Sequence, residues 1–308
     1  MTSSPSPVDL FGFGHCCADY LAVLRPFPEK GKKGDVIQSL IVGGGPVPTA
    51  CQCVSKWGKS VRFVGKVGDD SDGRMVVQGL IEEGIEASGM LIDPTVTTAR
   101  AYIWIDPLDG SRTVALDASR FHFPGEDELD VSLPAACRIF LADGRAADAT
   151  IKSMKIARES GATTILDAGA ARPRFREMLA LTDYAIVSRD VADTFAPGAT
   201  PEELARLLVE AGVKVAVVTI GERGAIYRGS EGVGLVAGFE VSEVFDTTGA
   251  GDVFHGGFVY GLLEGWPIER RLRFASAAAA LSTKKLSGRF SIPSLGEVEE
   301  FLRQSIPR

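Results

Sequence analysis

The chain has 308 residues, of which 45% are hydrophobic and 24% are charged, and its formal net charge is −7. This composition is ordinary for a globular enzyme, and the acidic balance argues against a nucleic-acid partner, which needs a basic face. No run approaches the roughly 18 apolar residues that span a bilayer, and the polar tail at residues 1–7 does not resemble a secretory signal. We therefore expect a cytoplasmic protein without a membrane partner.

The five cysteines are an odd number without a disulfide-like framework, which favours a reducing compartment. Cys51 and Cys53 lie in residues 49–57, which read as a helix. No second pair completes a zinc site. We expect these cysteines to be small buried core side chains.

Two early segments are rich in turns and β-branched residues. Residues 21–42 are broken by Pro26, Pro28, Gly31 and Gly34 and then become apolar. Residues 100–105 and 112–116 read as two strands joined by a turn at 106–110. Both segments predict a small β-structure separate from the rest of the fold.

From about residue 136 onward, predicted strands and helices alternate. We expect strands at 138–142, 163–167, 184–187 and 213–219, and helices at 148–160 and 201–211, the second capped by Thr200. The β-branched run 213–219 is typical of a strand that is buried on both faces. This alternation predicts an α/β fold with a mainly parallel sheet and helices on both sides.

A glycine-rich turn at residues 246–252 opens a further helix. Val244 and Phe245 read as the end of a buried strand, and apolar residues recur at helical spacing after the turn, at Val253, Phe254, Phe258 and Leu262. Because the first N–H groups of a helix are unsatisfied and lie at its positive end, the backbone of Gly249, Ala250 and Gly251 predicts an anion site.

Asp252 follows that turn immediately. A carboxylate beside an anion site is poorly placed to bind phosphate, but it is well placed to take a proton from a hydroxyl that attacks a phosphoryl group. The alternative is a capped helix with an aspartate in its first turn. The turn is not a Walker loop, because no Gly-Lys-Ser/Thr follows it.

The segment Asp246-Thr-Thr-Gly-Ala-Gly-Asp252 resembles the C-terminal signature of the ribokinase-like (PfkB) carbohydrate kinases. Other motifs agree in order and spacing: Asp19 matches the family's early substrate-binding aspartate, and the Gly43–Pro46 run with Gly65 and Gly68-Asp-Asp70 resembles the N-terminal signature. Thr219-Ile-Gly221-Glu-Arg-Gly224 matches the nucleotide turn. The resemblance extends over residues 8–301.

The resemblance implies a single domain, residues 1–308, with a three-layer αβα sandwich, a mainly parallel central sheet and a small β-sheet lid from about 15–43 and 97–121. It implies an ATP-dependent kinase that transfers the γ-phosphate to a sugar hydroxyl, with Asp252 as base and the Gly249–Gly251 backbone as anion hole. In the family the lid often forms a dimer interface, which favours a homodimer here.

The resemblance also assigns binding roles. Asp19 would hold sugar hydroxyls, and Gly43 and Gly44 would let the backbone approach the sugar. Thr219, Gly221 and Gly224, with Ser188, would shape the nucleotide site. Mg²⁺ accompanies the nucleotide without a dedicated cage. A K⁺ ion near the anion hole is a further option, because Asp246, Thr248 and residues 287–288 match that area loosely.

The chain departs from the family pattern in two places. Pro48 stands where many members have an asparagine that contacts the sugar, and Ser188-Arg-Asp-Val191 lacks the Asn-x-x-Glu motif. These departures, with other segments such as residues 141–145 and 288–289, resemble the bacterial sulfofructose kinase subgroup. That resemblance places Arg145 and Lys33 against an anionic group of the sugar.

Several alternatives stay open. Asp117, in the predicted lid, would repel an anionic sugar, so the acceptor is not fixed. A nucleoside or a vitamin alcohol is a second class of acceptor, since Tyr102 and Trp104 offer aromatic stacking surfaces. A third reading is a non-catalytic sugar-binding regulator, favoured by the missing Asn-x-x-Glu and opposed by the intact Asp252.

Overall fold

The computed structural model describes residues 5–305, so most of the predicted polar tail, residues 1–4, lies outside the described part. The centre of the fold is a sheet in the order β14-β13-β12-β11-β10-β9-β1-β4. The pairs from β12 to β4 are parallel, and β13 and β14 are added antiparallel at one edge. The bounds are β1 Val8–Phe13, β4 Val61–Val64, β9 Cys137–Ala142, β10 Thr163–Ala168, β11 Tyr184–Ser188, β12 Val215–Thr219, β13 Gly224–Gly229 and β14 Gly232–Ala237.

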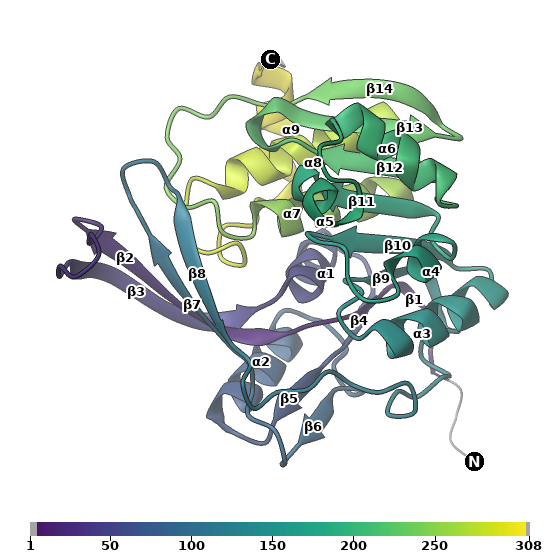
Figure 1. Cartoon of the computed structure of the whole chain (residues 1–308), viewed down its shortest axis with the longest axis horizontal. Helices are drawn as coiled ribbons and strands as arrows, with labels where there is room; N and C mark the ends of the chain where they lie inside the picture. Colours follow the sequence, from purple (N-terminus) through teal and green to yellow (C-terminus); the bar gives the residue numbers. More distant parts are fainter. Residues whose placement is uncertain (1–4, 306–308) are drawn as a thin grey trace.

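Helices cover both faces of this sheet, which gives the predicted three layers (Figure 1). One face carries α3 (Ala147–Glu159), α4 (Phe175–Leu179) and α6 (Pro201–Glu210), beside the short η1 (Arg189–Val191) and α5 (Ala192–Phe195). The other face carries α1 (Pro46–Lys56), α2 (Ser71–Glu82), α7 (Ala250–Leu263) and α8 (Ile268–Ser282), and α9 (Leu295–Gln304) packs on α8.

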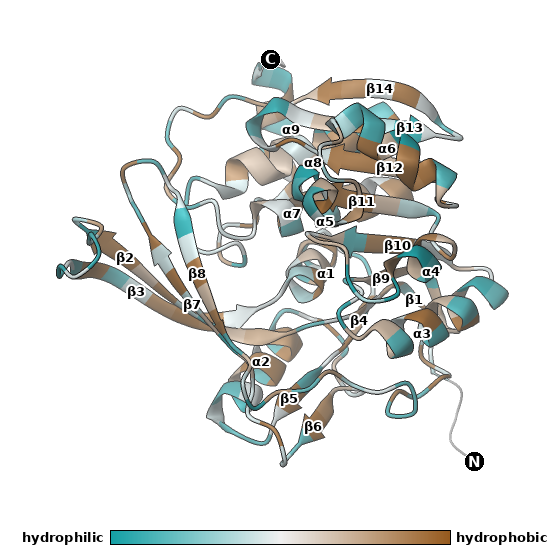
Figure 2. Cartoon of the chain, in the orientation of Figure 1, coloured by the Kyte–Doolittle hydropathy of each residue, from teal (hydrophilic) through white to brown (hydrophobic). Residues whose placement is uncertain are grey.

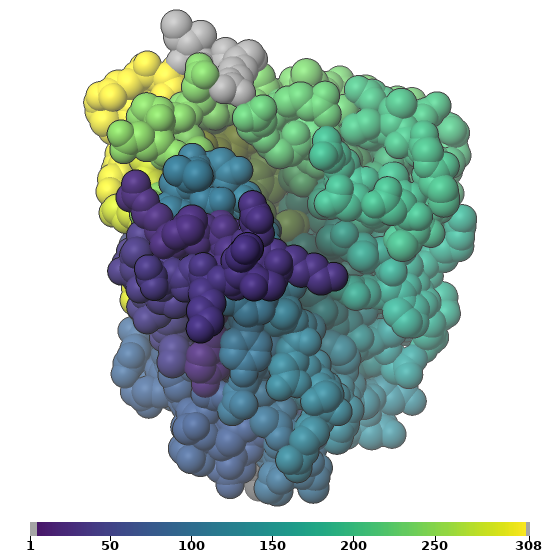
Figure 3. Space-filling model, turned by 60° about the vertical axis from the view of Figure 1, so that its left-hand side comes forward, coloured from purple at the N-terminus to yellow at the C-terminus, as the bar shows by residue number. Residues whose placement is uncertain are grey.

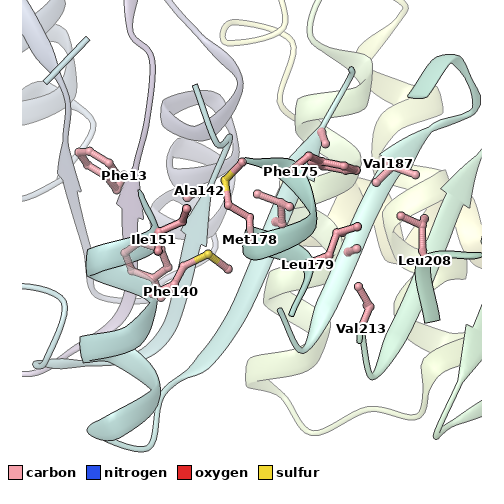
Figure 4. Packing of buried hydrophobic residues seen from close by; sticks show 14 of the residues in the cluster. Phe13, Phe140, Ala142, Ile151, Phe175, Met178, Leu179, Val187, Leu208 and Val213 are labelled. Carbon is pink, nitrogen blue, oxygen red and sulfur yellow. The ribbon is translucent and has the colours of Figure 1, made fainter. Parts of the chain in front are cut away.

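Neighbouring residues of each central strand point to opposite faces of the sheet and so belong to different hydrophobic clusters, because side chains alternate across a strand. Phe140 of β9 lies beside Ile151 of α3 on one face, in the same core cluster as Leu208 further along the sheet (Figure 4). Leu141 packs on the other face with Phe258 of α7. This two-sided burial explains the continuous apolar runs of the parallel strands, which are brown along most of β10 and β12 in Figure 2.

A second sheet stands beside the first, in the order β3-β2-β7-β8, at the left of Figure 1. Its strands are β2 (Cys17–Arg25), β3 (Asp35–Gly44), β7 (Arg100–Ile105) and β8 (Arg112–Asp117). Leu21, Ala101 and Ile103 form a buried cluster on one face. The two strands predicted from residues 100–116 are confirmed. A third sheet has two short strands, β5 (Lys66–Gly68) and β6 (Leu91–Asp93).

Most predicted elements are confirmed, including the α6 capping box of Thr200 with Glu203. The prediction that Val244 and Phe245 end a buried strand is wrong. They are half-buried, irregular residues, and the Phe245 N–H donates to the Thr283 carbonyl at the end of α8, not to a strand.

Cys51 and Cys53 are free and buried, as expected. No helix within residues 5–305 is long and apolar enough to cross a membrane.

Candidate active site

Chain direction creates a topological switch point, here called the crevice, between β1 and β9. The chain leaves β1 toward β4 on one side, and the strands from β9 to β12 extend on the other. In open parallel sheets, ligands bind outside the carboxyl ends of the strands at such a switch point. Here Asp143, which follows β9, accepts the N–H of His15 (2.8 Å) and the N–H of Arg145 (3.0 Å), and so joins the two loops.

The start of α7 lies at this same side of the sheet. Gly249 precedes the helix with φ 76°, in the left-handed region. A Cβ at this position would lie 2.6 Å from the Cα of Gly288. The turn therefore requires glycine both for its conformation and for its close approach to the segment after α8.

The first helical residues expose backbone donors. The Ala250 N–H closes the turn onto the Thr247 carbonyl at 3.3 Å, whereas the N–H groups of Gly251 and Asp252 have no acceptor among residues 5–305. A Cβ built at Gly251 would meet nothing within 4 Å. Free donors at the positive end of a helix, facing open space, suit an anion.

Asp252 is partly buried in the first turn of α7. Desolvation raises the pKa of its carboxyl to about 7, and the nearby negative charge of Asp167 adds to the rise. His255 and Arg112 act in the opposite direction. A carboxylate whose pKa lies near neutrality can accept a proton and still release it, which a general base requires.

Two neighbours of Asp252 come from its own helix and from the sheet. Asp167 ends β10 and is buried, and His255 lies one turn along α7. One oxygen or nitrogen atom from each of the three side chains lies within 4.8 Å of the others. Burial raises the pKa of Asp167, while the facing His255 lowers it.

The predicted acceptor residues also gather here. A Cβ at Gly44 would lie 2.1 Å from the carboxyl carbon of Asp19, so glycine makes room for that side chain. Cys17 Sγ donates to Asp19 Oδ1 at 3.1 Å. Burial raises the pKa of Asp19 to about 6. Gly43 adjoins the guanidinium of Arg289, to which a Cβ would approach within 2.7 Å.

Arg145 is half-buried, and so is Arg172, which follows β10. Neither guanidinium has a hydrogen bond or an ion pair with any described residue. Burial lowers the pKa of Arg172, and the positive charge of Arg145 lowers it further. The two cations therefore lie close together without an acidic counterpart bound to either.

Lys33 does not lie with these arginines. It is exposed in the connection between β2 and β3, at the outer end of the small sheet (Figure 1).

The predicted nucleotide residues line one cavity of about 460 Å³. Thr219, Gly221 and Gly224 border it together with Ala250 and Gly251, so it ends at the exposed donors of α7. Ser188 lies at its edge, since it pairs with Thr219 across β11 and β12 and lines the adjoining hollow. In the space-filling view, the small sheet stands in front of a recess bordered by the green segments (Figure 3).

The small sheet is attached directly to the glycine-rich turn. The Gly110 carbonyl accepts the N–H (3.1 Å) and the hydroxyl (2.9 Å) of Thr247, and Arg112 Nη1 donates to Thr247 Oγ1 at 2.9 Å. Arg112 also lines the 460 Å³ cavity. Sequence analysis gave no role to Arg112, because its partners lie 135 residues away.

Arg172, His255 and Asp167 were likewise assigned no site role from the sequence. The only available signal was position, since Asp167 is the last residue of a predicted strand, Arg172 follows that strand, and His255 lies one turn after Asp252. The residues that the sequence analysis named for a K⁺ ion lie next to one another. Asp246 accepts the N–H of Thr248 and of Ser287, each at 2.8 Å, and the Thr248 hydroxyl is buried without a partner in the part of the chain that the structure describes.

A model of the pfkB family of carbohydrate kinases matches residues 12–295. A fructokinase of Solanum tuberosum is 32% identical over 85% of this chain and 86% of its own length. A 5-dehydro-2-deoxygluconokinase of Geobacillus thermodenitrificans is 28% identical over 96% of this chain and 94% of its own. The crystal structure of Thermotoga maritima ribokinase superposes with a TM-score of 0.78 at 25% identity, covering 96% of this chain and 100% of that one.

The raised pKa of Asp252 has a consequence for stability. The pKa is about 7 in the folded protein against an ordinary value of 3.8, so the folded state holds this proton more tightly than the unfolded chain. Its contribution is present at low pH and is lost as pH rises through about 7. We expect Asp252→Asn to raise the melting temperature at about pH 8 and to change it little at about pH 4.

Thermal unfolding of both proteins across this pH range measures the effect. Asp127→Asn, at a side chain with 90% exposure, is the matched control and should show no such pH-dependent gain. An Asp252→Asn melting temperature that is unchanged or lower at the alkaline end would contradict the raised pKa.

Proposed function

The chain belongs to the pfkB family of carbohydrate kinases, and on that basis we propose that it transfers the γ-phosphate of ATP to a hydroxyl of a sugar or sugar derivative. The observation that carries the proposal is the position of Asp252. Asp252 directly follows Gly251, which lines the 460 Å³ cavity, and the charge of Asp19, among the acceptor residues, acts on its carboxyl group.

The cavity has the chemistry that a nucleotide needs. Its floor at Gly251 is open and carries neutral backbone donors, which suit phosphates, and Phe239, Val241 and Ala279 give apolar contact for a base. Mg²⁺, bound to the phosphates, would neutralise charge that develops during transfer. We assign no side chain of the protein as its ligand. We include K⁺ in the proposal, because Asp246 and the unpartnered Thr248 hydroxyl lie beside the anion hole.

The protein's own residues would align the reactants and move one proton. Asp19 and the backbone at Gly43 and Gly44 orient the acceptor so that its hydroxyl faces Asp252. Asp252 takes the hydroxyl proton as the new bond between the acceptor oxygen and the γ-phosphorus forms and the bond from that phosphorus to the bridging oxygen breaks, so that ADP leaves. The N–H groups of Gly251 and Asp252 hold the transferring group at the helix end while its negative charge is redistributed.

The two arginines favour an acceptor with an acidic group. Arg145 and Arg172 lie beside Asp143 and Asp167 at the crevice, and neither guanidinium has a protein acceptor in the described residues. A guanidinium pair matches a carboxylate, sulfonate or phosphate. The relative from Geobacillus thermodenitrificans is named for a gluconate acceptor. The sulfofructose kinase subgroup and the participation of Lys33 stay predictions.

The small sheet would act as the lid that excludes water from the reaction. Tyr102, Trp104 and Ile41 lie on the same face of it, since Tyr20 of β2 pairs with both Tyr102 and Ile41. This face is opposite to the buried cluster of Leu21, so the two aromatic rings do not point toward the acceptor. Their exposure of 36% (Tyr102 and Trp104) and 55% (Ile41) favours an interface with a second copy of the chain.

We predict ATP-dependent phosphorylation of at least one acceptor in a screen of ketoses, aldoses, sugar acids, sulfosugars, nucleosides and vitamin alcohols. On the best acceptor, Asp252→Asn should lower kcat by roughly 10²–10⁴, the usual contribution of a positioned base, while ATP affinity changes little. Coupled assays and nucleotide titration measure the two effects. Near-normal turnover in the variant would show that Asp252 is not the base, and ligand-induced thermal shifts without any turnover would favour the sugar-binding regulator.

Two glycine substitutions distinguish the loss of phosphate binding at the anion hole from the loss of folding stability. Gly251→Val should keep the melting temperature but reduce kcat strongly, because its side chain fills the open space where phosphate would sit. Gly249→Ala should instead destabilise the protein by about 1 kcal/mol or more, since its φ of 76° and the contact with Gly288 exclude a Cβ. Full activity of Gly251→Val would contradict the placement of the phosphate.

Truncation of Arg145 tests the acidic acceptor. We expect Arg145→Ala to raise KM for the acceptor roughly 10–100-fold, in line with the loss of a hydrogen bond to a charged group, and to leave KM for ATP nearly unchanged. Arg138→Ala, at the opposite end of β9 and paired with Asp9, is the control. If an uncharged sugar is the best substrate and its KM does not respond to Arg145→Ala, the acidic acceptor is excluded while the kinase function stands.

The lid interface is tested by charge insertion. Sedimentation should show a dimer for the natural protein and a monomer for the Ile41→Lys, Trp104→Glu variant, because charged side chains are depleted from interface cores. Leu235→Lys, on the equally exposed β14, should remain dimeric. A monomeric natural protein at micromolar concentration would contradict the interface.

A further inference from the structure

His255 is buried one turn after Asp252, and oxygen atoms face both of its ring nitrogens. Nδ1 lies 2.7 Å from the carbonyl oxygen of Gly251. Nε2 lies 3.2 Å from the carbonyl oxygen of Ile186, in the middle of β11, and 3.3 Å from Oδ1 of Asp167, near the end of β10. The ring therefore connects the first turn of α7 to two central strands.

Only one protonation state satisfies all of these contacts. A carbonyl or carboxylate oxygen accepts hydrogen bonds, and a neutral imidazole has one donor nitrogen and one acceptor nitrogen. In either neutral tautomer, one nitrogen of His255 would turn a lone pair toward an oxygen. An imidazolium donates from both nitrogens, so the geometry favours a cation.

Asp167 is the natural counter-charge. Its Oδ1 faces His255, and its Oδ2 is buried without any partner among residues 5–305. The carboxylate of Asp252 lies in the same small group. Two carboxylates this close repel each other unless a positive charge stands between or beside them.

We propose that His255, as an imidazolium paired with Asp167, is the positioning residue of the phosphoryl-transfer site: it holds the anion-hole turn of α7 against β10 and β11, and it balances the charge of Asp167 so that Asp252 works as the base. The inference rests on the kinase function proposed above. His255 acts through Gly251, Asp167 and Asp252 and touches no reacting atom.

Other charged or titratable groups face Asp252 from the surrounding elements. Asp19 of β2 acts in the same direction as Asp167 and raises the pKa of Asp252, whereas Arg112 of β8 lowers it together with His255. Cys53 of α1 also faces it, and its thiol is held neutral because burial raises its pKa well above its ordinary value. These groups stay in place when His255 or Asp167 is replaced.

The proposed pair of His255 and Asp167 predicts that replacing one partner and replacing the other shift the pH dependence of catalysis in opposite directions. Asp167→Asn removes a negative charge and leaves the imidazolium, so the acidic limb of kcat/KM should move to lower pH. His255→Gln leaves Asp167 uncompensated, so the limb should move to higher pH. The double variant removes both charges and should return the limb toward that of the natural protein.

The kinetic experiment measures kcat, both KM values and the pH profile for these three variants. We expect His255→Gln to lower kcat by at least about tenfold with smaller changes in KM, since misplacement by about 1 Å can cost about 10² in rate. His122→Gln, at an exposed histidine, and Asp183→Asn, at a buried aspartate where β11 begins, are the matched controls. The inference would be overturned if the acidic limbs of kcat/KM of the two single variants moved in the same direction. It would also be overturned if the melting temperatures of these variants fell while both acidic limbs stayed in place.

A second measurement does not depend on activity. Nitrogen-15 NMR of the histidines in the resting protein should show both nitrogens of His255 protonated at neutral pH. The chain has three histidines, and His15 is an internal neutral reference, because burial lowers its pKa to about 3. A single-protonated His255 would overturn the inference. Absence of turnover on every acceptor, beside a doubly protonated His255, would instead contradict the proposed function.

Discussion

The carboxylate of Asp246 fixes the part of the molecule on which the site depends. It is 1% exposed, and its two oxygens accept the N–H of Thr248 and the N–H of Ser287. These bonds hold the glycine-rich turn against the segment after α8, at the point where Gly249 and Gly288 touch. Because the turn is held from outside the helix, α7 can begin with free N–H donors and with Asp252 in its first turn.

Three parts of the chain then meet at that helix end. The hairpin of β7 and β8 in the small sheet is attached to it through Gly110, Arg112 and Thr247, and α7 itself packs on α1 and α8 in the sheet's second layer. The loops after β1 and β9 are joined through Asp143. A site composed in this way suits phosphoryl transfer, because alignment and electrostatic stabilisation provide most of its rate.

Sequence patterns that are local were sufficient for much of this structure. The alternation after residue 136, the two strands at 100–116 and the turn before Asp252 all depend on neighbours in the chain, and the structure contains each of them. Val244 and Phe245 misled the prediction, because apolar residues before a glycine turn are typical of a strand, whereas here they are held by the end of α8.

The charged side chains that surround Asp252 could not be predicted, because their contacts join segments that are distant in the sequence. Arg112 meets Thr247 across 135 residues, and His255 meets Ile186 across 69. Lys33 likewise has no local signal for the direction of its side chain: its charge suits an anionic acceptor, it is exposed in the connection between β2 and β3, and its participation stays a prediction.

The most direct test of the central claim is a crystal structure with the acceptor identified by the screen and a non-hydrolysable ATP analogue. The account predicts the acceptor hydroxyl within about 3.2 Å of an Asp252 carboxylate oxygen. It also predicts the γ-phosphate against the N–H groups of Gly251 and Asp252, in line with that hydroxyl. A complex in which another side chain contacts the hydroxyl, or in which the phosphates lie away from the start of α7, would contradict the account.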